Sequence, residues 1–195
     1  MRILAIITLI MFYAVYIGKM ILQRRKGIQT DQIAKGKAKN STFYTECFMK
    51  VATYLVVVVE VISILSMEQT SCFIVNILGI VLGIVWDIVF ALAVITMKDS
   101  WRAGIAQNDK TEMITCGIYQ FSRNPAFLGF DLVYVGILFM YFNWGLLICT
   151  IFAMVMLHLQ ILQEETYLSK VFGETYLEYK NKVRRYLGRR DKKKL

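Results

Sequence analysis

Five apolar runs separated by polar segments dominate the chain. A helix crosses the roughly 30 Å hydrocarbon core of a bilayer with about 20 apolar residues, and each run approaches that length. The last two runs are separated by little more than Asn143, a spacing typical of a helical hairpin. The pattern predicts an all-α membrane protein with about five transmembrane helices, at about residues 3–22, 47–67, 72–97, 126–142 and 144–162.

Two polar segments, 98–125 and 163–187, accompany the later apolar runs. In the second of them Leu168, Phe172 and Tyr176 recur at helical spacing, which predicts an amphipathic C-terminal helical segment. A basic tail, 188–195, follows. Since no internal repeat is evident, we expect one integral membrane domain over residues 1–195.

Composition supports a membrane protein and narrows its function. Hydrophobic residues make up 57% of the chain, against roughly 45–50% in soluble domains. The net charge of +9 is concentrated between the apolar runs and in the tail, so we expect no nucleic-acid partner. The four cysteines (Cys47, Cys72, Cys116 and Cys149) lie far apart without the spacing of metal ligands, so we expect packing thiols and no metal site.

Lysine and arginine positions predict the orientation in the membrane. Nearly all 23 of these residues lie in loop 23–50, in segment 98–125 and in the C-terminal part, whereas the opposite side carries only Arg2. Because these residues accumulate in cytoplasmic loops, we expect a cytoplasmic C-terminus and an N-terminus on the opposite side. The first run is expected to be a retained helix, since its stronger basic cluster follows it. The two polar segments then share one aqueous face.

The sequence GIYQFSRNPAFLG, from Gly117 to Gly129, has features of a ligand site. Pro125 suits the first turn of a helix, where free backbone N–H groups attract anions and polar ligands. Arg123, just before it, offers a planar fork to a carboxylate. The plain alternative is that Arg123 anchors the chain at the membrane surface and Pro125 only starts a helix.

Two adjacent carboxylates, Glu164 and Glu165, follow the fifth predicted helix. The negative pole of a helix disfavours acidic side chains at this end, so they require a compensating partner. Arg123 and a cationic ligand are both candidates. A solvated charge pair is the alternative.

The two clusters, in this order and at this separation, resemble an integral-membrane methyltransferase family that includes isoprenylcysteine carboxyl methyltransferase and, more distantly, the phospholipid N-methyltransferases. The resemblance covers about residues 98–187, with Trp101 as an upstream match, whereas the first two helices match only in being hydrophobic. The matching positions are Gly117, Tyr119, Arg123, Asn124, Pro125, Phe127 and Gly129, followed by Glu164, Glu165, Leu168, Phe172, Gly173, Tyr176 and Tyr179.

The resemblance implies direct in-line methyl transfer from S-adenosylmethionine to a lipophilic carboxylate, thiol or amine that enters from the membrane. The site would lie on the cytoplasmic side and open towards membrane lipids. Arg123 and Asn124 are the expected catalytic residues. The expected cofactor-binding residues are Gly117, Tyr119, Arg123, Asn124, Pro125, Glu164 and Glu165.

Phe127, Asp131 and His158 are expected on the acceptor side. Asp131 lies in an apolar run, where an ionisable residue is a functional hypothesis by default. His158, the one histidine of the chain, could equally be packed and hydrogen-bonded within its helix. The family often has histidine where Asn124 stands and tyrosine where Phe127 stands. Because asparagine does not titrate near neutral pH, these departures leave the acceptor open.

Two deeper acidic residues, Glu60 and Asp87, keep other functions open. Packing in a neutral, hydrogen-bonded form and a chemical role both fit them. A small transporter would use them with Asp131 as a polar path, and a non-enzymatic scaffold would explain the basic tail by attachment to anionic lipids. Neither alternative predicts cofactor binding. The oligomeric state is open as well.

Overall fold

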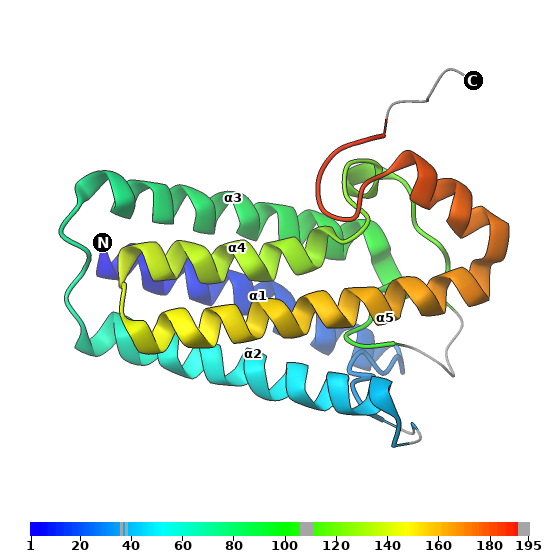
Figure 1. Ribbon diagram of the computed structural model, residues 1–195, viewed down its shortest axis with the longest axis horizontal. Helices are drawn as coiled ribbons and strands as arrows, with labels where there is room; N and C mark the ends of the chain where they lie inside the picture. Colours follow the sequence, from blue (N-terminus) through cyan, green and yellow to red (C-terminus); the bar gives the residue numbers. More distant parts are fainter. Residues whose placement is uncertain (36, 38, 106–110, 191–195) are drawn as a thin grey trace.

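The computed structural model describes residues 1–195 except 36, 38, 106–110 and 191–195. Its regular elements are α1 (Arg2–Arg25), α2 (Ser41–Ser66), α3 (Phe73–Met97), η1 (Lys98–Ser100), η2 (Gly117–Gln120), α4 (Pro125–Met140) and α5 (Trp144–Lys182), where η marks a short 3-10 helix. The α-helices lie alongside one another in a bundle (Figure 1). The all-α prediction is confirmed for the described part of the chain.

Local sequence explains how α4 and α5 begin. Pro125 occupies the first turn of α4, where a backbone N–H is not required. The side chain of Asn143 caps α5 by accepting a hydrogen bond from the N–H of Leu146 at 2.9 Å. The connection 141–143 is short, so the two helices are antiparallel neighbours. The predicted hairpin is confirmed.

Helix α4 is the most enclosed helix of the bundle and packs against α3 through glycines. A Cβ atom added to Gly79 would lie 2.6 Å from the carbonyl oxygen of Gly136, and one added to Gly129 would lie 2.8 Å from Cβ of Phe90. No side chain fits at such distances, so these glycines allow the two backbones to approach closely. Gly129, part of the matched motif, therefore serves helix packing.

Four helical stretches are long and apolar enough to cross a membrane: α1, α2, α3 with its η1 extension, and α5. Their outward faces carry many exposed apolar side chains, as expected for contact with lipid. Helix α4 has only 16 residues and lies among the others. The five helices agree with the sequence pattern, and five complete membrane crossings remain a prediction.

Helix α5 continues well past its apolar part, which ends near Leu162. The predicted span and part of the predicted amphipathic segment thus form one helix, interrupted at Gly173 by a non-helical conformation with φ 52° and ψ −130°. Helical spacing in the sequence extends to Tyr186, but the helix ends at Lys182. Residues 174–190, called here the cover segment, turn back over the start of α4 (Figure 1).

The polar segments gather at one end of the bundle. There Lys26 forms an ion pair with Asp99 at 2.8 Å, which joins the end of α1 to η1. At the opposite end Arg2 donates to the carbonyl of Met67 at 3.2 Å. The cover segment and the start of α4 also lie at the polar end (Figure 1). The two motif segments therefore meet at one face.

Candidate functional site

Three polar residues that precede α4 are buried. Ser122, Arg123 and Asn124 expose 1%, 7% and 8% of their surface. The hydroxyl oxygen of Ser122 accepts the N–H of Asn124 at 3.0 Å, which turns the chain into the helix. Because a buried charge is costly unless it is paired, the guanidinium of Arg123 requires a carboxylate partner here.

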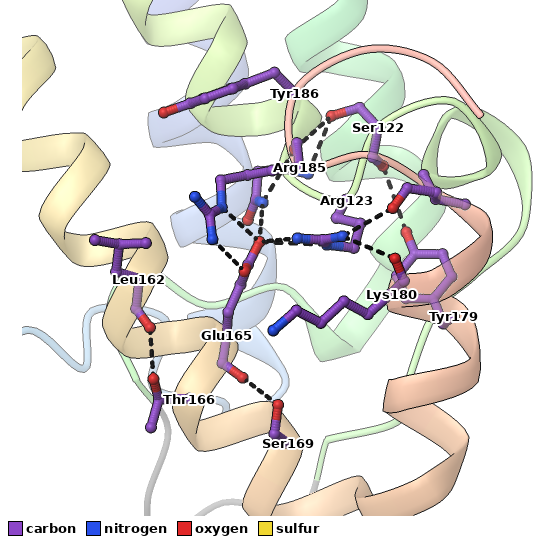
Figure 2. A network of polar contacts seen from close by, with 12 residues as sticks. Ser122, Arg123, Leu162, Glu165, Thr166, Ser169, Tyr179, Lys180, Arg185 and Tyr186 are labelled. Atoms are coloured by element: carbon purple, nitrogen blue, oxygen red, sulfur yellow. Dashed lines mark hydrogen bonds and ion pairs between the residues drawn. The ribbon is translucent and has the colours of Figure 1, made fainter. Parts of the chain in front are cut away.

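Glu165 is that partner and binds two arginines (Figure 2). Its Oε1 accepts Nη2 of Arg123 at 2.7 Å, and its Oε2 accepts Nη2 of Arg185 at 3.0 Å. Asn124 Nδ2 also donates to Oε1, at 3.3 Å. Burial alone would raise the pKa of Glu165, but the hydrogen bonds and charges of Arg185 and Arg123 outweigh it and hold the pKa below its ordinary value. Glu165 is therefore ionised at neutral pH.

The same arginine fastens the cover segment. Nη1 of Arg123 donates to the carbonyls of Val183 at 2.8 Å and Lys180 at 3.2 Å. The backbone N–H of Gly188 donates to the carbonyl of Phe121 at 2.7 Å. The guanidinium that the sequence analysis offered to a ligand carboxylate thus pairs with Glu165 and holds the cover segment in place.

Glu164 faces in another direction, because successive helical residues point about 100° apart. Its Oε1 accepts Nε2 of Gln160 at 3.0 Å. Burial raises the pKa of Glu164 to about 7. The hydrogen bond from Gln160 lowers this pKa and the charge of Glu46 raises it, but both effects are smaller than that of burial. The adjacent acids therefore differ in protonation, and Glu164 is the one that changes charge near neutral pH.

Glu164 lies in the wall of a cavity of about 130 Å³ beneath the cover segment, called here the covered cavity. Tyr179 of the cover segment donates its hydroxyl to the carbonyl of Tyr119 at 2.6 Å. Burial raises the pKa of Tyr119, so its hydroxyl stays protonated. The wall also includes Trp101, Arg102, Glu112, Arg123, Asn124, Ala126, Phe127, Leu168, Phe172 and Tyr176, together with Met97, Ser100, Thr111, Met113 and Ile114.

A second cavity of about 270 Å³, called here the apolar cavity, lies between α1, α2, α4 and α5. Tyrosine and other apolar side chains form most of its wall, and Lys50 and Arg102 add positive charge. Four described residues line both cavities: Trp101, Arg102, Ala126 and Phe127. Two cavities of different character thus share one wall at the start of α4.

The structure brings together about half of the residues predicted for the site. Tyr119, Arg123, Asn124, Phe127 and Glu164 all line the covered cavity. The others lie outside its wall. Glu165 is behind Arg123, Pro125 starts α4, and Gly117, with φ +58°, packs beside Thr96.

The two remaining predicted acceptor residues, Asp131 and His158, line neither cavity. Nδ1 of His158 hydrogen-bonds the hydroxyl of Tyr186 in the cover segment, and the two rings stack. Asp131 is buried, and its Oδ1 has no hydrogen-bond partner within the described structure. His158 therefore corresponds to the packed, hydrogen-bonded alternative that the sequence left open.

The N-terminal helices contribute residues that sequence reasoning missed. Tyr13 and Tyr16 of α1, and Lys50 and Tyr54 of α2, line the apolar cavity. Arg185 was assigned only to the basic C-terminal part, yet it binds Glu165. One signal in the sequence could have indicated this cavity: Tyr13 and Tyr16 lie within an apolar run, and a hydroxyl at membrane depth needs a partner or a cavity.

Known proteins match the part of the chain that builds most of the covered cavity and about half of the apolar cavity. Residues 71–175, more than half of the chain, match the family profile described as phospholipid methyltransferase. Two proteins named probable protein-S-isoprenylcysteine O-methyltransferase, from Oryza sativa subspecies indica and japonica, are each 31% identical over 126 residues. The match covers 62% of this chain and 65% of each rice protein. The chain thus spans just under two thirds of the length of these relatives.

Proposed function

The chain belongs to the phospholipid methyltransferase family, and from that premise we propose that it transfers a methyl group from S-adenosylmethionine to a lipophilic acceptor taken from the membrane. The observation that carries the proposal is the wall shared by the covered and apolar cavities. Catalysis by positioning needs the two reactants to meet in one place. A polar donor and an apolar acceptor bound in these cavities would meet at Phe127 and Trp101.

Side chains of the covered cavity suit the charge and polarity of the cofactor. S-adenosylmethionine, when bound, supplies an electrophilic methyl group on a positively charged sulfur. The carboxylate of Glu164 would attract its positive charge, and the rings of Tyr119 and Phe172 offer faces that attract cations. Asn124 adds an amide to the same wall. Arg123 would act by holding the cover segment over the cavity, which excludes water from the reaction.

The apolar cavity suits the acceptor. Its wall of tyrosine and aliphatic side chains would bury a hydrocarbon chain, which is favourable by about 0.8 kcal/mol for each CH₂ group. Neither cavity has a histidine or cysteine among its described lining residues. We expect direct transfer, because the methyl group of the donor is already electrophilic, and the chain then binds, orients and desolvates the reactants without forming a covalent intermediate.

The acceptor is a lipophilic carboxylate, thiol or amine. The rice relatives are named for O-methylation of isoprenylcysteine, and Lys50 and Arg102 beside the apolar cavity would attract a carboxylate. We therefore place a prenylcysteine carboxylate first in the acceptor panel, with ethanolamine phospholipids and lipophilic thiols beside it. By the charge of its loops, the site faces the cytoplasm.

The test combines donor binding with transfer on detergent-purified protein. We expect S-adenosylmethionine and S-adenosylhomocysteine to bind in a calorimetric titration. Radiolabelled methyl donor should label an acceptor of the panel or of a host lipid extract. Absence of binding by both ligands, together with absence of any labelled product, would contradict the proposal.

A matched pair of substitutions tests which cavity takes the acceptor. Val57 lines the apolar cavity, whereas the adjacent Val58 is 55% exposed on the outer face of α2. Val57→Phe should raise the acceptor KM about tenfold, because overpacking a filled site costs roughly 1–3 kcal/mol, and should leave donor affinity unchanged. Val58→Phe should change neither. Equal acceptor KM values for the two variants would show that the acceptor does not bind in the apolar cavity.

A further inference from the structure

Two segments far apart in sequence form one side of the apolar cavity. Ile33 comes from the connection between α1 and α2, and Gly104 from the segment after η1. These segments are paired through their backbones: Gln32 N–H donates to the Ala103 carbonyl at 2.8 Å, and Ala103 N–H to the Thr30 carbonyl at 3.0 Å. This wall belongs to no helix, so its position depends on what holds it.

A buried carboxylate of α2 holds both segments. Glu46 is fully buried, and its Oε2 accepts the N–H of Ala34 at 2.6 Å. Its Oε1 accepts the N–H of Ile105 at 3.1 Å and pairs with Nζ of Lys37 at 2.5 Å. Ala34 and Ile105 each directly follow a residue that lines the apolar cavity. Glu46 therefore sets where that wall stands.

The same carboxylate reaches towards the covered cavity. Nε2 of Gln160 on α5 lies 3.5 Å from Oε1 of Glu46 and donates to Oε1 of Glu164 at 3.0 Å. Gln160 is itself fully buried. One amide thus joins the acid that holds the acceptor wall to the acid that faces the proposed donor.

Stability alone is a poor reason for such an arrangement. The Lys37 and Glu46 side chains are 3% and 0% exposed, and taking two charges out of water often costs as much as their attraction returns. Apolar residues of similar volume commonly serve stability as well or better. The buried carboxylate instead fixes the positions of the backbone N–H groups that it binds, and so the position of the cavity wall.

We propose that Glu46 is a positioning residue for methyl transfer, which aligns the acceptor wall directly and Glu164 through Gln160. The proposal rests on the proposed function of the two cavities. It predicts that substitutions can separate the effect on acceptor binding from the effect on donor binding. Gln160 contacts the donor side, whereas the Glu46 carboxylate contacts both sides.

The experiment compares Glu46→Gln, Gln160→Leu and a matched control, Gln163→Ala, in the purified full chain. Gln163 donates to Thr45 Oγ1 at 2.8 Å and so also joins α2 to α5, but it lines neither cavity. The readouts are acceptor KM, kcat, affinity for S-adenosylhomocysteine by calorimetry, and thermal unfolding.

Glu46→Gln should raise acceptor KM about tenfold or more, the scale of a lost hydrogen bond to a charged group, and should weaken donor affinity less. Gln160→Leu should weaken donor affinity about fivefold, the scale of one net hydrogen bond, and leave acceptor KM unchanged. Gln163→Ala should alter only thermal unfolding. If Glu46→Gln does not fold, Gln160→Leu against Gln163→Ala still decides the donor half.

Unchanged KM and affinity in both Glu46→Gln and Gln160→Leu, or equal losses in Gln163→Ala, would overturn the proposal while the wild-type protein remains active. A wild-type protein that neither binds donor nor transfers methyl would instead contradict the proposed function, and this inference with it. The two failures are therefore distinguishable in one set of measurements.

Discussion

At the scale of single residues, Glu164 and Glu165 show how one helix step separates two roles. Both acids end the apolar part of α5 and looked like one charged pair in the sequence. Glu165 is ionised between Arg123 and Arg185, whereas Glu164 faces the covered cavity. Because adjacent helical residues point about 100° apart, one charge pairs with arginines and stabilises the fold, whereas the other is available to a ligand.

Glu164 should make donor binding depend on pH. Its pKa is raised by burial to about 7, so the carboxyl is protonated and uncharged below that pH and negative above it. We expect affinity for the cationic S-adenosylmethionine to increase as pH rises from about 6 to 8. The increase should be about tenfold if the donor binds only when Glu164 is ionised, because the ionised fraction rises by about that factor. Calorimetric titrations across this range measure it.

Glu164→Gln is the control for this dependence, because the amide does not titrate. Its affinity should be weaker than that of the wild type above pH 7 and nearly constant with pH. An affinity of the wild type that falls as pH rises would contradict the placement of Glu164 beside the positive charge.

Glu165 should matter chiefly for stability and for closure of the cover segment. Glu165→Gln removes the carboxylate from the buried Arg123, and breaking a buried pair costs about 3–5 kcal/mol. Arg185 is 32% exposed at its side chain, so Arg185→Met should cost only about 1 kcal/mol. Thermal unfolding in detergent compares the two. Equal losses would mean that Arg123 does not depend on Glu165.

At the scale of elements, α5 joins the membrane part to the site. Its apolar half packs on α2 and α4, and its polar half turns at Gly173 to place the cover segment above the covered cavity. The φ of +52° and ψ of −130° at Gly173 are open to glycine and unfavourable for other residues. Backbone conformation at one residue thus determines where Tyr176 and Tyr179 lie.

Gly173→Ala should displace the cover segment. No atom lies within 4 Å of an added Cβ, so the cost is conformational and amounts to about 1–3 kcal/mol. We expect lower donor affinity and a lower Tm. Gly18→Ala in α1 also meets no atom within 4 Å and adopts ordinary helical angles, so it should be neutral or slightly stabilising. Wild-type donor affinity in Gly173→Ala would show that the bend is not needed.

At the scale of the whole molecule, the bundle separates a polar end, which carries the site, from an end with short turns. Among the residues that the structure describes, the polar end holds nearly all lysines and arginines, which supports a cytoplasmic site. Two exposed native cysteines mark the two ends: Cys72 lies before α3 and Cys116 before η2. They allow the orientation to be tested without added tags.

Single-cysteine variants that keep either Cys116 or Cys72 should label from opposite sides. In sealed vesicles with the cytoplasmic face outward, a membrane-impermeant maleimide should modify Cys116 at once and Cys72 only after detergent is added. The labelled fraction on denaturing gels measures this. The reverse pattern would place the site on the other side of the membrane.

The sequence by itself determined the helices, the hairpin and the meeting of two polar motifs at one end. These follow from local properties, because the length of an apolar run and the residues at its ends decide whether and where a helix forms. It also predicted five of the residues that line the covered cavity, since Tyr119, Arg123, Asn124, Phe127 and Glu164 carry the family resemblance.

Only the tertiary structure decided what each side chain faces. Neighbouring helical residues point about 100° apart, so the separate roles of Glu164 and Glu165 depend on how α5 is rotated against its neighbours. The apolar cavity is built from four helices and two connecting segments, and most of its lining residues belong to no motif that the sequence shows. Glu46 shows the same limit. The sequence assigned this acid no role, and its buried contacts exist only because folding brings α2 together with residues 34–37, Ile105 and Gln160.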